Sequence, residues 1–164
     1  MARCPRAHEW QNREPMSAVL LLKLIHVLAA IVAVGANLTY SFWLRRAGLD
    51  RDRLTWTIDG IRRLDRTVAN PAYILLLISG VLMVLTGAYS FAARWLQVAV
   101  VLYAAVALLG ILAFAPAVRR QAAEAARDPT TPAYAEAARR SDLLGVLTTG
   151  VAVVIVILMV TKPF

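Results

Sequence analysis

SAVLLLKLIHVLAAIVAVGANLTYSFW, at residues 17–43, is an apolar stretch with one formal charge, Lys23. As an α-helix it rises about 1.5 Å per residue and reaches about 40 Å, enough to cross a hydrocarbon core about 30 Å thick. A secretory signal peptide is the alternative, because residues 34–36 (VGA) form a small-residue cleavage motif. The apolar stretch continues past this motif to Trp43, beyond the hydrophobic region of a signal peptide. We therefore predict a transmembrane helix.

The remainder of the chain is similarly apolar. Of the 164 residues 60% are hydrophobic and 17% are charged, so a soluble domain would have to expose large apolar patches. We predict an all-α fold, a single integral membrane four-helix bundle over residues 16–164 that follows a flexible polar tail at residues 1–15. Met16 would be as natural a start as Met1. The predicted spans are residues 17–43, 68–89, 93–115 and 142–161.

Two polar connections carry helical patterns of their own. In residues 44–67 apolar side chains recur at helical spacing beside arginines, which predicts a cytoplasmic interfacial helix lying on the membrane surface, with Trp56 near the headgroups. A solvated basic loop is the alternative. The alanine-rich residues 116–141, broken by residues 128–132 (DPTTP), predict a helical extension between spans three and four.

The net charge is +8, and most of the basic residues lie in these two connections. Their distribution predicts the orientation of the protein in the membrane, because loops rich in Lys and Arg stay in the cytoplasm. We predict a bacterial inner-membrane protein with both termini on the extracytoplasmic side, and no nucleic-acid partner. The basic residues assigned to the cytoplasm are Arg45, Arg46, Arg51, Arg53, Arg62, Arg63, Arg66, Arg119, Arg120, Arg127, Arg139 and Arg140. Those assigned to the outside are Arg3, Arg6, Arg13, Arg94 and Lys162.

One histidine lies within a predicted span. A helical projection of the first span places this histidine on a side with small and polar residues, which should face the bundle. The residues of this side are His26, Ala30, Ala33, Asn37 and Tyr40. One hypothesis is that His26 binds haem b, with Lys23 pairing with a propionate or supplying the second ligand and Met83 at a similar depth on the second span. The alternative is a histidine hydrogen-bonded to a neighbouring Tyr, Ser or Thr, with Lys23 extending outward. The sequence favours this second hypothesis, because the predicted spans contain no second histidine that could complete a bis-histidine haem site.

Three stretches together resemble a known family: KLIHVLAAIVAVGANL, RRLDRTVANPAYILLLISGVLM and the terminal LMVTKPF. They are similar to the bacterial predicted integral membrane proteins called DUF2269, over about residues 16–164. This resemblance implies four helices and no assigned reaction. The group is distantly similar to copper-resistance protein D and to HemJ-type protoporphyrinogen oxidases, which also open with a helix carrying an early histidine. In HemJ-type proteins that histidine binds haem b, which implies the same role for His26.

The sequence favours a protein without a reaction of its own. No nucleophile with a base, phosphate loop, zinc spacing or dinucleotide fingerprint is present. We predict a small structural or accessory membrane component whose partners are the lipid bilayer and either other membrane subunits or a second copy in a homodimer. The alternatives are a haem b protein with redox or porphyrin chemistry at His26, and a solute or ion carrier.

Overall fold

The computed structural model describes residues 14–163. Most of the predicted tail, residues 1–15, lies outside this range, and Glu14 and Pro15 belong to the first helix. The elements are α1 (Glu14–Ala47), α2 (Arg51–Leu64), η2 (Asp65–Ala69), α3 (Asn70–Leu85), α4 (Arg94–Leu109), η3 (Gly110–Phe114), α5 (Ala115–Arg127) and α6 (Pro132–Thr161).

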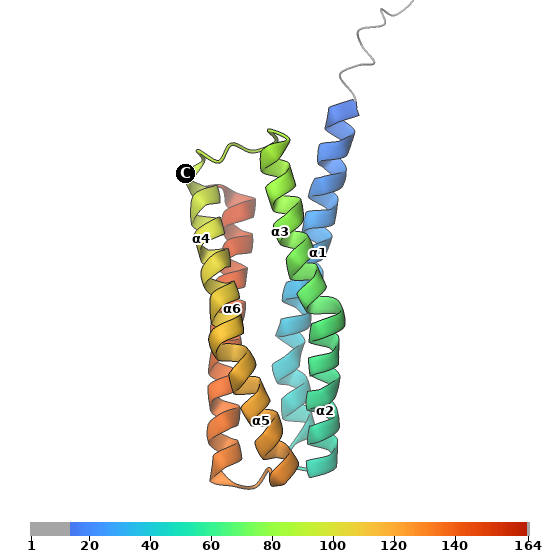
Figure 1. Ribbon diagram of the computed structural model, residues 1–164, viewed down its shortest axis with the longest axis vertical. Helices are drawn as coiled ribbons and strands as arrows, with labels where there is room; N and C mark the ends of the chain where they lie inside the picture. The colour runs from blue at the N-terminus through green and yellow to red at the C-terminus, as the bar shows by residue number, and fades with distance from the viewer. Residues whose placement is uncertain (1–13, 164) are drawn as a thin grey trace, which may run out of the picture.

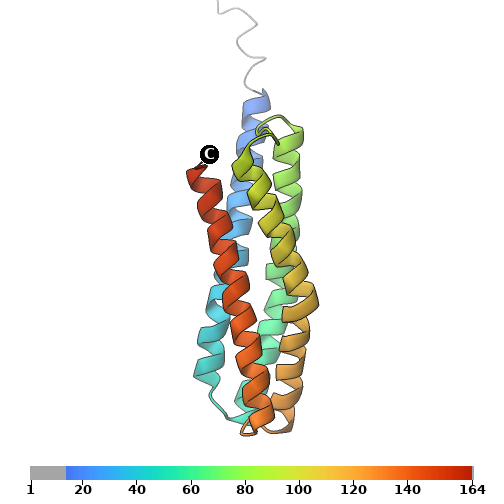
Figure 2. The same cartoon turned by 90° about the vertical axis from the view of Figure 1, so that its left-hand side faces the viewer.

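Within the described residues the elements join into four long helices that are apolar enough to cross a membrane. The helices α2, η2 and α3 form one continuous helix, and α4, η3 and α5 form another. All four run along the long axis of the molecule, and α6 ends at the same end of the bundle at which α1 begins (Figures 1 and 2). The predicted all-α bundle with four membrane-spanning helices is confirmed.

One detail of the prediction needs correction. Residues 51–64 are helical and amphipathic as predicted, but this helix continues into α3 along the bundle axis instead of turning onto the membrane surface (Figure 1). Its apolar side, with Leu54 and Ile58, is buried against the other helices of this bundle. Trp56 therefore lies about 18 Å from Val68 along the helix axis.

Two short π-helical segments mark the middle of the molecule. η2 precedes Pro71 and η3 precedes Pro116, in each case by two residues. A proline ring inside an α-helix clashes with the carbonyl group four residues earlier, and a wider π turn accommodates the ring without ending the helix. Pro71 is therefore inside a helix that continues from α2 through η2 into α3.

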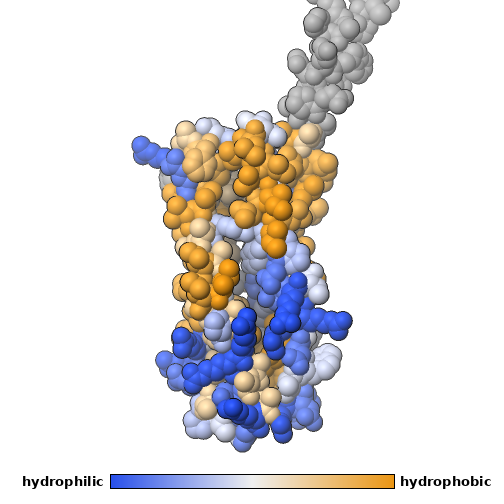
Figure 3. All heavy atoms as spheres, viewed as in Figure 1, coloured by the Kyte–Doolittle hydropathy of each residue, from blue (hydrophilic) through white to orange (hydrophobic). Residues whose placement is uncertain are grey.

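The two halves of the bundle differ in surface character. The half nearest the termini is covered mainly by apolar side chains, whereas the other half carries all the described arginines except Arg94 (Figure 3). We call the second the polar half; it consists of the end of α1, α2, α5 and the first turns of α6. Its core contains Ala47, Leu54, Ile58, Ala125 and Tyr134. The predicted helical extension between spans three and four is part of this half, formed by α5 and the start of α6.

In the apolar half the helices pack as two pairs. α1 packs against α3, and α4 packs against α6. Within the described residues no Cα atom of α3 comes within 8 Å of a Cα atom of α4, so these two helices are not in direct backbone contact. At the outer end, Lys162 Nζ lies 4.8 Å from the ring centre of Tyr89 and 5.5 Å from that of Trp95, which ties the end of α6 to the start of α4.

Candidate functional site

His26 lies in the interface between α1 and α3. Its Nδ1 is 2.9 Å from the hydroxyl oxygen of Ser79, a buried residue of α3. A Cβ added to Gly80 would stand 3.4 Å from His26 Cε1, so this glycine lets the imidazole ring pack closely against α3. The structure thus shows the hydrogen-bonded histidine of our alternative hypothesis.

The hydrogen bonds around Ser79 assign the tautomer of His26. The Ser79 hydroxyl has one proton and lies 2.6 Å from the carbonyl oxygen of Leu75, to which it donates. His26 Nδ1 must then carry a proton and donate it to Ser79 Oγ, which leaves Nε2 unprotonated. An unprotonated Nε2 is the form in which histidine ligates a metal.

The other residues of the predicted haem site lie on α1 and α3. Met83 is buried on α3, three residues beyond Gly80, whereas Lys23 is exposed. The Nδ1 and Cε1 edge of His26 is filled by α3, and the cavity described below does not border this residue. Haem binding at His26, Lys23 and Met83 stays a prediction. A Soret band lost in His26→Ala is the observation that would support it.

A second group of polar side chains joins α1, α3 and α4. The Asn37 amide donates to the Tyr73 hydroxyl at 2.5 Å and to the Ala33 carbonyl at 3.2 Å. The Tyr103 hydroxyl donates to the carbonyl oxygen of Tyr73 at 2.7 Å. This last bond spans the gap between α3 and α4, so it connects the two helix pairs of the apolar half.

Two carboxylates lie beside these groups and accept hydrogen bonds from hydroxyls of α1. Tyr40 donates to Asp65 at 3.5 Å, and Ser41 donates to Asp142 at 3.2 Å. Within residues 14–163 the salt bridges are Arg62 with Asp59 and Arg127 with Glu124.

A cavity of about 210 Å³ lies where the apolar half meets the polar half. Its walls come from α1, α2, η3, α5 and α6, and it is partly open; Leu38, Asp142 and Val146 are exposed residues of its lining. The polar residues that line it are Asn37, Tyr40, Ser41, Gln121, Ser141, Asp142 and Thr149. Leu38, Leu44, Ile58, Ile61, Phe114, Val118, Gly145 and Val146 complete the lining.

Two residues of this lining are polar and almost fully buried. Gln121 and Ser141 are each 5% exposed, and among residues 14–163 neither side chain has a hydrogen-bond partner. Sequence inspection missed both residues. Gln121 lies between Ala117 and Ala125 at intervals of four, all three are buried, and this spacing could have indicated a polar group on an inward face.

No group of three or more His, Cys, Asp or Glu side chains able to hold a metal ion occurs within residues 14–163.

Comparison with known proteins gives one match. A sequence profile of the family described as "Predicted integral membrane protein (DUF2269)" matches residues 20–163. No curated protein and no solved structure matches the chain.

Proposed function

The chain belongs to the DUF2269 family of predicted integral membrane proteins, and on this premise we propose that it acts as a small accessory component of the bacterial inner membrane. In this proposal the apolar half anchors the protein and the polar half projects into the cytoplasm, where it binds a partner subunit or a second copy of the chain. Both termini then lie on the extracytoplasmic side.

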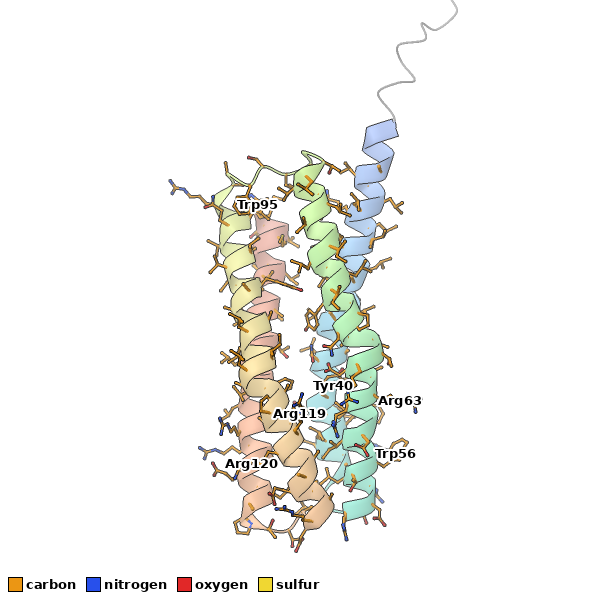
Figure 4. All side chains as sticks on the ribbon, viewed as in Figure 1. Tyr40, Trp56, Arg63, Trp95, Arg119 and Arg120 are labelled. Carbon is orange, nitrogen blue, oxygen red and sulfur yellow. The ribbon has the colours of Figure 1, made fainter. Side chains whose placement is uncertain are left out.

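Charge distribution supports this orientation. The arginines of α2, α5 and the start of α6 belong to the polar half, and Arg63, Arg119 and Arg120 are seen there in Figure 4. Loops rich in Lys and Arg are retained in the cytoplasm during membrane insertion. The helices are also longer than one crossing requires, because the 34 residues of α1 extend about 50 Å against a hydrocarbon core of about 30 Å.

Thiol labelling tests the orientation. In a Cys4→Ser background, Asp52→Cys lies at the start of α2 and Ser90→Cys lies in the turn between α3 and α4. We expect a membrane-impermeant maleimide to label residue 90 in intact spheroplasts and to label residue 52 only after permeabilisation. Labelling of residue 52 from outside would reverse the proposed orientation.

The observation that carries the docking proposal is the exposure of Trp56. This side chain is 79% exposed and points away from the bundle on the outer side of α2, the side on which Arg63 also lies (Figure 4). Tryptophan and arginine are the residues most enriched in the energetic centres of protein interfaces. We therefore place the centre of the partner-binding surface at this exposed indole on the polar half.

Photo-crosslinking in cells tests this docking surface. With a photoreactive amino acid at position 63 we expect a product of defined mass, twice that of the chain for a homodimer and a different mass for another subunit. Trp56→Ala should lower the yield about tenfold or more, because interface tryptophans contribute about 2 kcal/mol or more. Trp43→Ala removes another exposed tryptophan, in α1, and should leave the yield unchanged. Absence of any protein product, or equal yields from all three chains, would contradict the proposal.

A further inference from the structure

The cavity between the two halves contains polar groups that the fold itself does not use. Gln121 and Ser141 are buried at its wall without a hydrogen-bond partner among the described residues. Burying a polar group without a partner is unfavourable, and native proteins pair such groups with protein atoms, water or a ligand. No side-chain nitrogen or oxygen in residues 14–163 is both fully enclosed and unpartnered, so the polar atoms of both residues remain reachable from the cavity.

The charge of the lining favours a cation. Asp142 contributes a carboxylate, and no Lys, Arg or His side chain borders the cavity. Asn37 directs its N–H groups to Ala33 and Tyr73, which leaves its carbonyl oxygen as an acceptor. Gln121 and Ser141 add further oxygen atoms that can accept hydrogen bonds. The cavity thus offers one negative charge and several acceptors, which complement a positively charged donor.

The volume of the cavity and its apolar walls limit which positively charged hydrogen-bond donor it can bind. A volume of about 210 Å³ equals that of about seven waters of roughly 30 Å³ each, enough for a few heavy atoms. Leu44, Ile58 and Val118 provide apolar walls suited to a short carbon chain. We propose that the cavity binds the primary ammonium group of a small amine, with Asp142 facing its charge and Gln121 and Ser141 accepting its N–H groups.

Two sources can supply this group. The cavity lies where the apolar surface ends, so the ethanolamine headgroup of a phospholipid can reach it from the membrane. A free alkylamine can reach the same acceptors from the aqueous side, because the cavity is partly open and Asp142 in its lining is exposed. Choline headgroups form the natural control, because a quaternary ammonium carries the same charge and has no N–H to donate.

The test uses the full-length protein in vesicles that contain equal amounts of phosphatidylethanolamine and phosphatidylcholine. Native mass spectrometry of the released protein should show retained ethanolamine lipid about tenfold above choline lipid, since hydrogen bonds to charged groups are strong enough for such a factor. In pure phosphatidylcholine, added free ethanolamine should raise the thermal transition if the soluble amine is also bound. A preference for the ethanolamine lipid, stabilisation by the free amine, or both would support the proposal and identify the source.

Three variants locate the binding. Asp142→Asn and Gln121→Leu should each remove the lipid preference and the stabilisation, whereas Asp59→Asn, an exposed carboxylate on α2 outside the cavity, should retain both. The thermal transition in pure phosphatidylcholine shows that each variant is folded. Equal retention of the two lipids with no stabilisation by free ethanolamine would overturn the proposal. A preference that persists in both cavity variants would overturn it as well, because the amine would then be held elsewhere.

Discussion

Leu54→Ala is expected to lower the free energy of unfolding by about 3 kcal/mol. Leu54 is fully buried, and it packs with Ile58, Ala125 and Tyr134 in the core of the polar half. Removal of the leucine side chain loses its buried apolar contacts and leaves a cavity that the surrounding helices fill only in part. Thermal or denaturant unfolding in mild detergent, followed by far-UV circular dichroism, measures the loss.

A second leucine of α2 provides the control. Leu64 lies ten residues further along the same chain and is 41% exposed, so Leu64→Ala should change stability by much less than Leu54→Ala. Equal effects of the two substitutions would mean that the polar half has no specific core. The polar half folds around Leu54. Leu54→Ala should therefore also increase proteolysis within residues 48–64, while the apolar half remains protected.

Gly80→Leu is expected to cost about 2 kcal/mol and to break the hydrogen bond between His26 and Ser79. Even a Cβ at this position would stand 3.4 Å from His26 Cε1, and the larger leucine side chain must push α1 and α3 apart. A lower thermal transition in detergent would report the cost. A shift of the imidazole resonances of His26 in the NMR spectrum would report the lost bond.

Gly150→Leu is the matched control for this substitution. Gly150 is on α6 in the apolar half, and a Cβ there would meet nothing within 4 Å. We expect this variant to keep the wild-type transition, because its added side chain faces the lipid or detergent. An equal loss in both variants would show that glycine-to-leucine changes are harmful in any of these helices, and the close approach of α1 to α3 at Gly80 would not be the cause.

The sequence predicted those features that depend on local periodicity and composition. Four apolar stretches predicted the four membrane helices, and the helical projection of residues 17–43 correctly placed His26, Asn37 and Tyr40 on the side that faces the bundle. The periodicity of apolar residues predicts which side of a helix is buried, because the apolar side must pack against other atoms whatever the position of the helix in the fold.

Other features could not be predicted in this way. The spacing of Leu54 and Ile58 identified an apolar face but did not reveal that other helices would cover it instead of the membrane. The predicted second span began at residue 68, and the sequence did not reveal the π turn in η2 that joins α2 and α3 into one helix ahead of Pro71. The cavity needs side chains from α1, α2, η3, α5 and α6, so Gln121 and Ser141 become significant only when these distant segments are brought together.

The two π segments also determine the rotational alignment of the molecule. A π turn contains one residue more than an α turn, so each segment rotates everything beyond it by about 100° around the helix axis relative to an uninterrupted α-helix. Deleting one residue from η2 would restore ordinary α-helical winding and would rotate α2 by that angle relative to α3. Leu54 and Ile58 would then leave the core for the surface, and Trp56 and Arg63 would turn toward a different side of the bundle. The single inserted residues in η2 and η3 thus keep the membrane-embedded and the arginine-bearing ends of each helix in phase.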